Sequence, residues 1–356
     1  MGSVRQTLLK SLLLPGFPAL LKHVQRDCAT VFMLHRFEDA ERGIAGCDVT
    51  HLRHALAYLT RNHYELLPLA DLFERLGGKG PLARGAVAFT IDDGYLEQAT
   101  VAAPVFAEFG CPVTTFVTTG FLDGKLWLWW DQIEHVFQHA ARRRVQLRFG
   151  DTLLDYRWEN DEQRNRAQAD FIAECKRIPE AEKAAAIAQL ALALGVEIPH
   201  LPPPRYAPMS WDQLRACEGM GMAFGPHSVT HPVLSRTTPA AMTYEITESW
   251  SRLRAEARSP LPIFCYPNGG WDDFGAREMG ALRQLGFLGA IASEPGYANG
   301  MAFRDGADNR YRVQRFGFPD GLPHVIQYVS GVERIKQLLR GRAPAPNSQR
   351  LDAQRS

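Results

Sequence analysis

Residues 89–94 (FTIDDG) place two adjacent carboxylates at the end of an apolar run, and this feature constrains the fold most. Residues 85–91 have the β-branched and aromatic character of a strand that is buried on both faces in a parallel sheet. Because side chains alternate along a strand, Asp92 and Asp93 are expected to point in different directions, and Gly94 allows an immediate turn. One carboxylate can then bind a metal ion while the other acts as a base. A strand that ends in an ordinary Asp-Gly turn is the alternative interpretation.

Predicted strands and helices alternate along most of the chain. The expected strands cover residues 30–35, 64–69, 85–91, 112–119, 221–225, 261–266, 288–293 and 311–316. The expected helices include residues 50–60, 71–76, 95–109, 238–255 and 272–285. Such alternation predicts an α/β fold with a parallel sheet or a barrel.

The alternation is interrupted between about residues 121 and 205. This stretch has the pattern of a small hairpin followed by two polar helices, at residues 161–177 and 179–194. We interpret it as a mainly helical insertion within a domain that covers residues 28–340. Its charged residues are expected to form a solvated face, and substrate contact is the alternative.

The two ends of the chain differ from this domain. Residues 1–27 have the pattern of an amphipathic segment. Residues 341–356 are rich in Arg, Pro, Ala and Gln and are expected to be disordered.

Composition narrows the class of protein and its cellular location. The chain has 356 residues and a net charge of +1, which argues against a nucleic-acid-binding role. The six cysteines form no Cys-x-x-Cys pair and are expected to be buried thiols in a reducing compartment. Pro15 and Pro18 interrupt the apolar start, and no stretch reaches the ~20 apolar residues of a membrane-spanning helix. We therefore expect a cytoplasmic protein, with peripheral membrane contact through the first segment as the alternative.

His227 and His231 lie four residues apart, directly after the strand predicted at residues 221–225. On a helical turn this spacing puts two imidazoles on one face, where both can bind one divalent metal ion. Asp93, at the end of another parallel strand, would complete a set of two histidines and one carboxylate. Three protein ligands leave positions for water and substrate, as catalytic metal sites require. A chance His-x-x-x-His pair is the alternative.

Three short segments carry a resemblance to a known family. Residues 90–94 (TIDDG), 227–232 (HSVTHP) and 264–269 (FCYPNG) resemble, in this order, the first three motifs of the polysaccharide deacetylases, which are the NodB-homology carbohydrate esterases. The resemblance covers about residues 29–317 and is interrupted by the insertion. It implies a distorted (β/α)7 barrel, similar to a TIM barrel, and an N-acetylated glycan as substrate.

The resemblance also implies roles for individual residues. Asp93, His227 and His231 match the metal ligands of the family, for which zinc is the usual ion and other divalent ions are alternatives. Asp92 matches the general base. It would take a proton from the water that the metal activates, as this water attacks the carbonyl of an N-acetyl group.

The third motif is expected to stabilise the oxyanion that forms in this attack, together with the metal. Pro267 has no backbone N–H, so the N–H of Asn268 is the expected donor. The residues expected to contact the substrate are Tyr95, Tyr266, Asn268, Gly269 and Trp271.

The chain departs from the family pattern in two places. Phe264 and Cys265 stand where many members have an arginine that orients the base, and residues 312–316 (RVQRF) lack the histidine that protonates the leaving amine. His324 lies beyond this motif on a predicted helix, and no role is assigned to it. His35 is expected to be the general acid, because relatives similar to the exported poly-N-acetylglucosamine deacetylases have a histidine at this strand end. The alternative is a histidine bonded to a local carbonyl.

Trp127, Trp129 and Trp130 open the insertion next to Asp131. They are expected to anchor the insertion to the barrel, and stacking on sugar rings is the alternative.

The leading hypothesis is a metal-dependent hydrolase that removes N-acetyl groups from an oligosaccharide, a polysaccharide or a lipid-linked glycan intermediate in exopolysaccharide synthesis. An amidohydrolase of the same superfamily that acts on a small or cyclic amide is one alternative. A non-catalytic glycan-binding relative is another.

Overall fold

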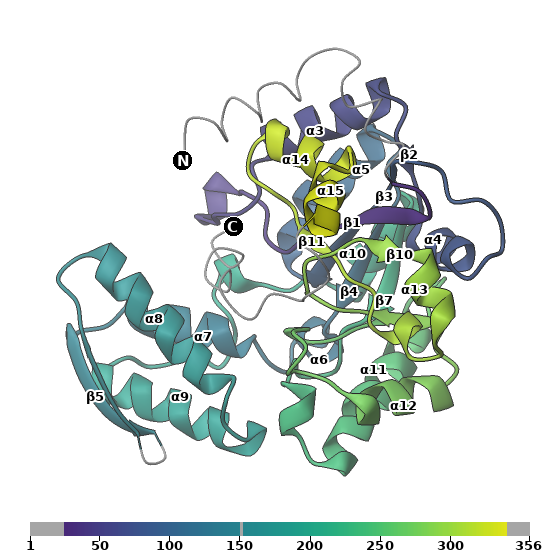
Figure 1. Cartoon of the computed structure of the whole chain (residues 1–356). Coiled ribbons are helices and arrows are strands. Elements are labelled where there is room, and N and C mark those ends of the chain that lie inside the picture. Colours follow the sequence, from purple (N-terminus) through teal and green to yellow (C-terminus); the bar gives the residue numbers. More distant parts are fainter. Residues whose placement is uncertain (1–24, 150–151, 340–356) are drawn as a thin grey trace.

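The computed structural model describes residues 25–149 and 152–339 (Figure 1). The tail predicted at residues 341–356 and nearly all of the segment predicted at residues 1–27 lie outside the described residues. Within the described ranges, no helix combines the length and the apolar character needed to cross a membrane.

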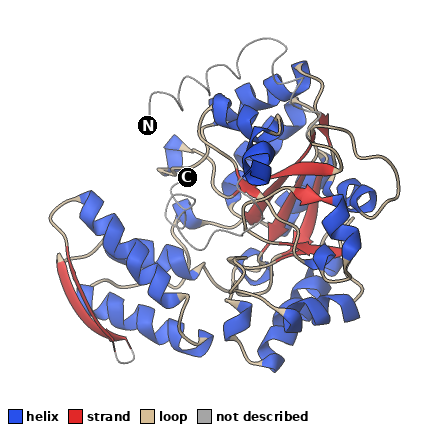
Figure 2. Cartoon of the chain, in the orientation of Figure 1, coloured by secondary structure: helices blue, strands red, loops and turns tan. Residues whose placement is uncertain are grey.

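Mostly parallel strands form the centre of the main domain (Figure 2). The order of neighbouring strands in the larger sheet is β1 (Cys28–Leu34), β3 (Ala86–Asp93), β4 (Val113–Val117) and β7 (Met222–Pro226), with β11 (Phe316–Gly317) on the other side of β1. A second sheet pairs β8 (Ile263–Cys265) with β9 (Gly289–Ile291), also in parallel.

Two parallel bridges join these sheets. Phe224 of β7 pairs with Pro260 just before β8, and Ile291 of β9 pairs with Val313 just before β11. The seven segments β1, β3, β4, β7, β8, β9 and β11 therefore follow one another around a ring. The predicted α/β fold is confirmed, and this order is that of the expected (β/α)7 barrel.

Two short strands flank the ring. β2 (Glu65–Leu66) pairs in parallel with β3, and β10 (Ala298–Asn299) pairs antiparallel with β1.

Helices follow most strands, as the alternating pattern predicts. They are α3 (Val49–Arg61), α4 (Leu69–Leu76), α5 (Ala103–Glu108), α6 (Thr119–Leu122), α10 (Trp211–Gly219), α11 (Pro239–Glu256), α12 (Ala276–Gln284), α13 (Gly300–Asp305), α14 (Leu322–Val329) and α15 (Val332–Leu339).

Two predictions of local structure need correction. The helix expected at residues 95–109 begins as a π-helical turn, Gln98–Ala102, in which the N–H of Ala103 donates to the carbonyl of Gln98. Pro104 follows and has no N–H for a regular helical bond, which is consistent with the wider turn. The strand expected at residues 311–316 is mostly irregular, because residues up to Tyr311 form a 3₁₀ turn.

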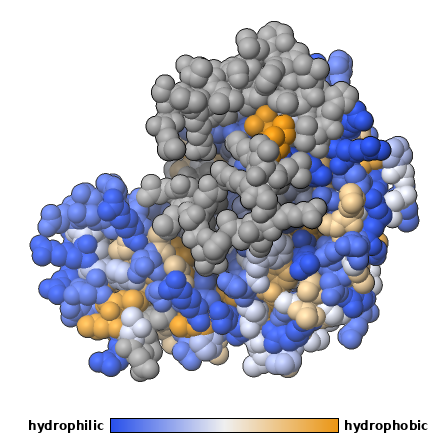
Figure 3. Space-filling view, in the orientation of Figure 1, coloured by the Kyte–Doolittle hydropathy of each residue, from blue (hydrophilic) through white to orange (hydrophobic). Residues whose placement is uncertain are grey.

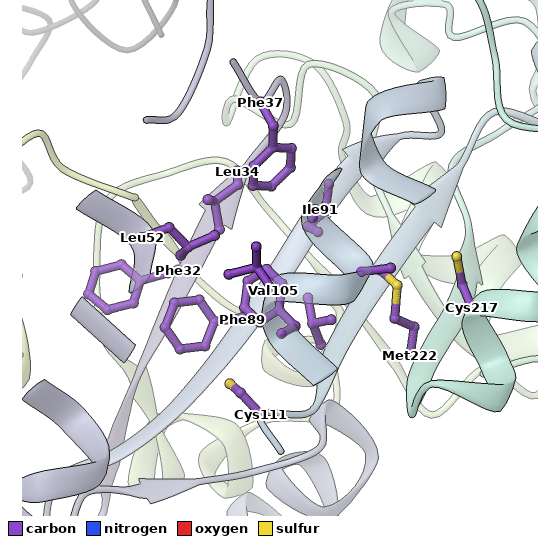
Figure 4. Close-up of a cluster of buried hydrophobic side chains, with 14 of the residues drawn as sticks. Phe32, Leu34, Phe37, Leu52, Phe89, Ile91, Val105, Cys111, Cys217 and Met222 are labelled. Carbon is purple, nitrogen blue, oxygen red and sulfur yellow. The ribbon is translucent and has the colours of Figure 1, made fainter. Parts of the chain in front are cut away.

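Alternate residues of β3 enter two different hydrophobic clusters. Val87, Phe89 and Ile91 pack with side chains of α3 and α5 in the outer cluster (Figure 4). Ala86 and Ala88 face the opposite way and pack with residues of β1, β8 and β9 across the ring. The alternation expected for a fully buried strand therefore separates a helix-facing side from a ring-facing side.

The insertion forms a separate lobe with its own hydrophobic core (Figure 1). It contains α7 (Trp129–Gln138), the hairpin of β5 (Arg144–Phe149) and β6 (Thr152–Arg157), α8 (Asp161–Cys175) and α9 (Glu180–Leu194). Its visible surface is mainly hydrophilic (Figure 3), which agrees with the solvated face expected from its charges. Trp127 is buried in the outer cluster of the main domain, which agrees with its expected role as an anchor, whereas Trp129 is buried in the core of the insertion.

We predict that Phe171→Ala lowers the free energy of unfolding by about 3–5 kcal/mol, because Phe171 is fully buried in the core of the insertion. The matched control is Leu192→Ala on α9, whose side chain is 81% exposed and whose loss is expected to change stability by less than about 0.5 kcal/mol. Denaturant titration of both variants measures the difference. Equal losses of stability in Phe171→Ala and Leu192→Ala would contradict a separate hydrophobic core in the insertion.

Candidate active site

The strand ends of the ring bring the predicted site residues together. Asp92 and Asp93 close β3, His227 follows β7, and the third motif begins within β8 and continues into the turn after it. His35 comes directly after β1. Since these strands are parallel, their carboxyl ends meet at one edge of the ring, where barrel enzymes carry their active sites.

Asp93, His227 and His231 form a compact and buried group of metal-ligating atoms. The Oδ1 atom of Asp93 lies 3.6 Å from Nε2 of each histidine, and the two Nε2 atoms are 3.1 Å apart. Ligands about 2.1 Å from a tetrahedral ion lie roughly 3.4 Å from one another, so these separations fit one ion. The predicted metal ligands are therefore positioned to share a divalent cation.

The three side chains of this group carry no positive charge of their own near neutral pH. Burial raises the pKa of Asp93 well above its usual value, and the neighbouring Asp92 carboxylate raises it further. Burial lowers the pKa of His227 to about 4 and that of His231 well below its usual value. Both imidazoles are therefore neutral near pH 7, and the protein itself places no cation among the three ligands.

Two neighbouring elements hold the loop that carries the histidines. His227 donates from Nδ1 to the carbonyl of Cys265 at 2.8 Å, which leaves its Nε2 atom for the metal. The carboxylate of Glu245, on α11, accepts hydrogen bonds from the backbone N–H groups of Val229 and Thr230 at 2.8 and 2.9 Å. Glu245 was not predicted from the sequence, where it lies in an ordinary amphipathic helix pattern.

Asp92 is held by an arginine that the sequence analysis did not identify. The guanidinium of Arg315, just before β11, donates to both carboxylate oxygens of Asp92 at 2.8 Å. It also donates to the hydroxyl of Thr90 at 2.9 Å, so Thr90 and Asp92 lie on the same side of β3. Both residues are buried, and Arg315 has no exposed surface.

Arg315 replaces the arginine that is missing from the third motif. The thiol of Cys265, at the position of that motif, lies 3.3 Å from the same guanidinium. The sequence did indicate that Arg315 is buried, because it lies between the apolar residues Val313 and Phe316 near the end of a predicted strand. A buried arginine there requires a carboxylate partner.

The ion pair determines the charge of Asp92. Burial alone would raise the pKa of this carboxyl, but the charge and the hydrogen bonds of Arg315 more than offset it and hold the pKa well below its usual range. Asp92 is therefore ionised at neutral pH.

His35 lies beside Asp92, with its Nε2 atom 3.8 Å from Oδ2 of the carboxylate. Its side chain is 38% exposed, so it reaches both the base and the solvent side of the site. The amide of Gln98 donates to the backbone carbonyls of His35 and Asp92 at 2.7 and 2.5 Å and fixes the two strand ends relative to each other. Burial lowers the pKa of His35, and the Asp92 carboxylate opposes this shift.

The residues expected to contact the substrate have different environments. The hydroxyl of Tyr266 donates to the carbonyl of Tyr311 at 2.8 Å, and its ring is fully buried. Tyr95 is also buried, and its hydroxyl donates to Asp131 at 2.7 Å. Trp271 is 42% exposed. Substrate contact of these residues remains a prediction.

The turn after β8 has two consecutive residues with a left-handed backbone, a conformation that favours glycine and asparagine over other residues. Asn268 has a φ of 61°, and Gly269 has a φ of 71°. A Cβ atom on Gly269 would lie 2.6 Å from the hydroxyl of Ser293, so only glycine fits there. This turn brings the backbone of the third motif close to the chain after β9.

Left-handed backbone conformations are concentrated at this edge of the ring. Among the described non-glycine residues with positive φ, four lie in the three motifs: Asp93, Ser228, His231 and Asn268. Residues in such conformations cost roughly 1–3 kcal/mol each and are typical of functional sites.

The comparisons with known families agree with this geometry. A family model described as "Polysaccharide deacetylase" matches residues 181–287, which include the second and third motifs. No curated protein matches the chain. The predicted resemblance to polysaccharide deacetylases is confirmed, and with it the enzyme class, a hydrolase of carbon–nitrogen bonds other than peptide bonds.

Several solved structures share the fold. A deacetylase of Streptococcus pyogenes, PplD, solved in complex with acetate, has a TM-score of 0.54 and 15% identity over 85% of this chain and 98% of that chain. IcaB from Ammonifex degensii has a TM-score of 0.52 and 17% identity over 86% and 98% of the two chains. A de-N-acetylase from Aggregatibacter actinomycetemcomitans has a TM-score of 0.53 and 14% identity over 85% and 100%.

We predict that Arg315→Met moves the acidic limb of the pH profile of hydrolysis to higher pH. Without the guanidinium, burial dominates and raises the pKa of Asp92. Asp92 then becomes protonated at a higher pH. As the solution is acidified, the variant therefore loses activity at a higher pH than the unchanged protein. Measurement of kcat/KM against pH in the variant and in the unchanged protein tests this shift.

The conservative control is Arg315→Lys, which keeps one positive charge and is expected to shift the limb less. The same ion pair also stabilises the fold. Because the pKa of Asp92 is depressed in the folded state, its contribution is present above the unfolded value of about 3.9 and is lost as the pH falls through the folded value. An acidic limb that does not move in Arg315→Met would exclude control of Asp92 by this arginine.

Proposed function

We propose that this chain, a polysaccharide deacetylase by its family match and its fold, uses one divalent metal ion to remove N-acetyl groups from a glycan. The observation that carries the proposal is the separation of two adjacent carboxylates. Asp93 lies with two neutral histidines in a metal-ligand geometry, whereas Asp92 is paired with Arg315 and lies next to His35.

Asp93, His227 and His231 would hold the ion, with zinc as the first candidate because two imidazoles and one carboxylate suit it. When bound, such an ion supplies Lewis-acid polarisation of the acetyl carbonyl and lowers the pKa of water towards ~7.

Asp92 is the proposed general base. Its carboxylate is ionised at neutral pH and is fixed by two hydrogen bonds from Arg315, so it can accept a proton from the attacking water without reorienting. The water oxygen then bonds to the acetyl carbon, and the carbonyl oxygen gains negative charge.

The third motif is proposed to stabilise the negative charge on the carbonyl oxygen. Pro267 offers no N–H, so the backbone N–H of Asn268 is the first donor in the turn. The side-chain Nδ2 atom of Asn268 is buried and has no hydrogen-bond partner among the described residues, which leaves a second donor for a bound acetyl group.

His35 is the proposed general acid. Its partly exposed imidazole has its Nε2 atom 3.8 Å from the carboxylate of Asp92. Because burial lowers the pKa of His35, its proton is supplied during the reaction: the proton that Asp92 takes from the water passes to the imidazole, which donates it to the amine as the carbon–nitrogen bond breaks. The products are acetate and a sugar with a free amino group, and the proton taken by Asp92 balances the proton given by His35.

The substrate is proposed to be an N-acetylated oligosaccharide, polysaccharide or lipid-linked glycan. The partly exposed ring of Trp271 offers an aromatic face for a sugar. We propose a cytoplasmic location, because all six cysteines are free thiols. Arg315 removes one of the two grounds for the small-amide alternative, a base without an orienting arginine, and the altered fifth motif at residues 312–316 remains as the other.

The first experiment compares the unchanged protein with Asp92→Asn and Asp93→Asn. We expect the unchanged protein to bind one zinc ion and to release acetate from N-acetylglucosamine oligomers. Asp92→Asn is expected to keep the metal and lose acetate release by about 10²–10⁴-fold, because the base is removed. Asp93→Asn is expected to lose both.

Metal content by elemental analysis and acetate release by a coupled assay give the two readouts. A chelator should abolish activity, and added zinc should restore it. Metal binding without acetate release by the unchanged protein would redirect the proposal to another amide, and a protein that binds no metal would contradict it.

His35→Gln tests the general acid. We expect kcat to fall by about 10²–10⁴-fold with unchanged zinc content, because the proton for the leaving amine is lost. The matched control is His324→Gln on α14, a partly exposed histidine outside the site, which is expected to leave kcat unchanged. Near-normal turnover of His35→Gln would remove this residue from the mechanism.

A further inference from the structure

The first turn of the insertion reaches the metal ligands. Trp129 and Trp130 are neighbours at the start of α7, but their side chains have different surroundings. Trp129 is buried in the core of the insertion, with the ammonium of Lys183 4.3 Å from its ring centre. Trp130 instead packs against the imidazole of His231, with 4.4 Å between ring centres and 68° between ring planes.

His231 lacks the hydrogen bond that orients most metal-binding histidines. Its Nδ1 atom is buried and has no partner among the described residues, whereas Nδ1 of His227 donates to the carbonyl of Cys265. His231 also has a left-handed backbone, with a φ of 59°. The ring of His231 therefore depends on packing for its orientation, and Trp130 supplies an edge-to-face contact.

Trp130 is itself fixed by a hydrogen bond to the main domain. Its Nε1 atom donates to the hydroxyl of Tyr95 at 3.0 Å, and this hydroxyl donates to Asp131 at 2.7 Å. The guanidinium of Arg36 lies 3.9 Å from the centre of the Tyr95 ring. Because Tyr95 follows Asp93 by two residues, this network ties the start of α7 to the strand end that carries another metal ligand.

A second contact joins the insertion to the same loop. The carboxylate of Glu180, at the start of α9, accepts a hydrogen bond from the backbone N–H of Val233 at 3.2 Å. Glu180 is also paired with Lys183 at 2.7 Å, so its position is fixed within the insertion. Two helices of the insertion therefore contact residues 231–233 from separate points.

We propose that Trp130 is a positioning residue for the metal ligand His231, so that the insertion sets the metal affinity of the active site. The proposal rests on the proposed metal-dependent function. The insertion then serves as part of the metal site, in addition to being a solvated lobe.

Zinc affinity of Trp130→Ala and Trp130→Phe tests the role of Trp130, measured by competition with a chromogenic chelator. We expect Trp130→Ala to weaken zinc binding by about tenfold or more, the range found when residues that support metal ligands are removed. Trp130→Phe keeps an aromatic edge on His231 and is expected to recover part of this affinity.

Trp129→Ala is the matched control, because it removes the same side chain one residue earlier on the same helix. It is expected to lower Tm, since Trp129 is buried, and to leave zinc affinity unchanged. Tm of each zinc-free variant is measured in parallel.

The outcomes separate the two proposals. Zinc affinity in Trp130→Ala equal to that of the unchanged protein overturns the positioning role. The positioning role is also overturned if Trp130→Ala and Trp129→Ala both lose zinc affinity in proportion to their loss of Tm. A general loss of stability in the insertion would then explain the weaker zinc binding. An unchanged protein that binds no zinc overturns the proposed function itself.

Discussion

Two buried carboxylates on adjacent residues need two separate sources of positive charge, and this electrostatic constraint organises the site. Asp92 obtains its counter-charge from Arg315, which donates to both of its oxygens. Asp93 has two neutral imidazoles around it and lacks a cation of its own. The end of β3 divides the pair between these environments, so one carboxylate stays ionised beside a guanidinium and the other is left for the proposed metal ion.

Backbone strain is the cost of this division. β3 ends with Asp93 at a φ of 88°, and the loop that supplies the histidines contains two further left-handed residues, Ser228 and His231. Strain of this kind persists only where surrounding contacts determine the conformation. Glu245 holds the backbone of the histidine loop from α11, and Trp130 packs on its last ligand from the insertion. The proposed metal ligands are thus held by elements that are far apart in the sequence.

The sequence predicted what depends on local pattern. The alternation of strands and helices gave the α/β class, and the ends of β3 and β7 gave the residues that the structure brings together as Asp93, His227 and His231. Arg315 was missed because its partner lies 223 residues earlier: the apolar residues around Arg315 indicate a buried arginine, but they do not identify the carboxylate that it pairs with. The contact of Trp130 with His231 was missed for the same reason, since the sequence offered only anchoring or sugar stacking for this ring.

The distance between Arg315 and Asp92 along the chain also has a consequence for protein synthesis. The ligands Asp93, His227 and His231 are all translated before the segment that contains Arg315. The ribosome must therefore deliver nearly the whole barrel before the guanidinium can meet the carboxylate and β11 can pair with β1. A nascent chain can gather its proposed metal ligands early, but the proposed base gains its counter-ion only when the last strand is added, so completion of the proposed site follows the closing of the ring.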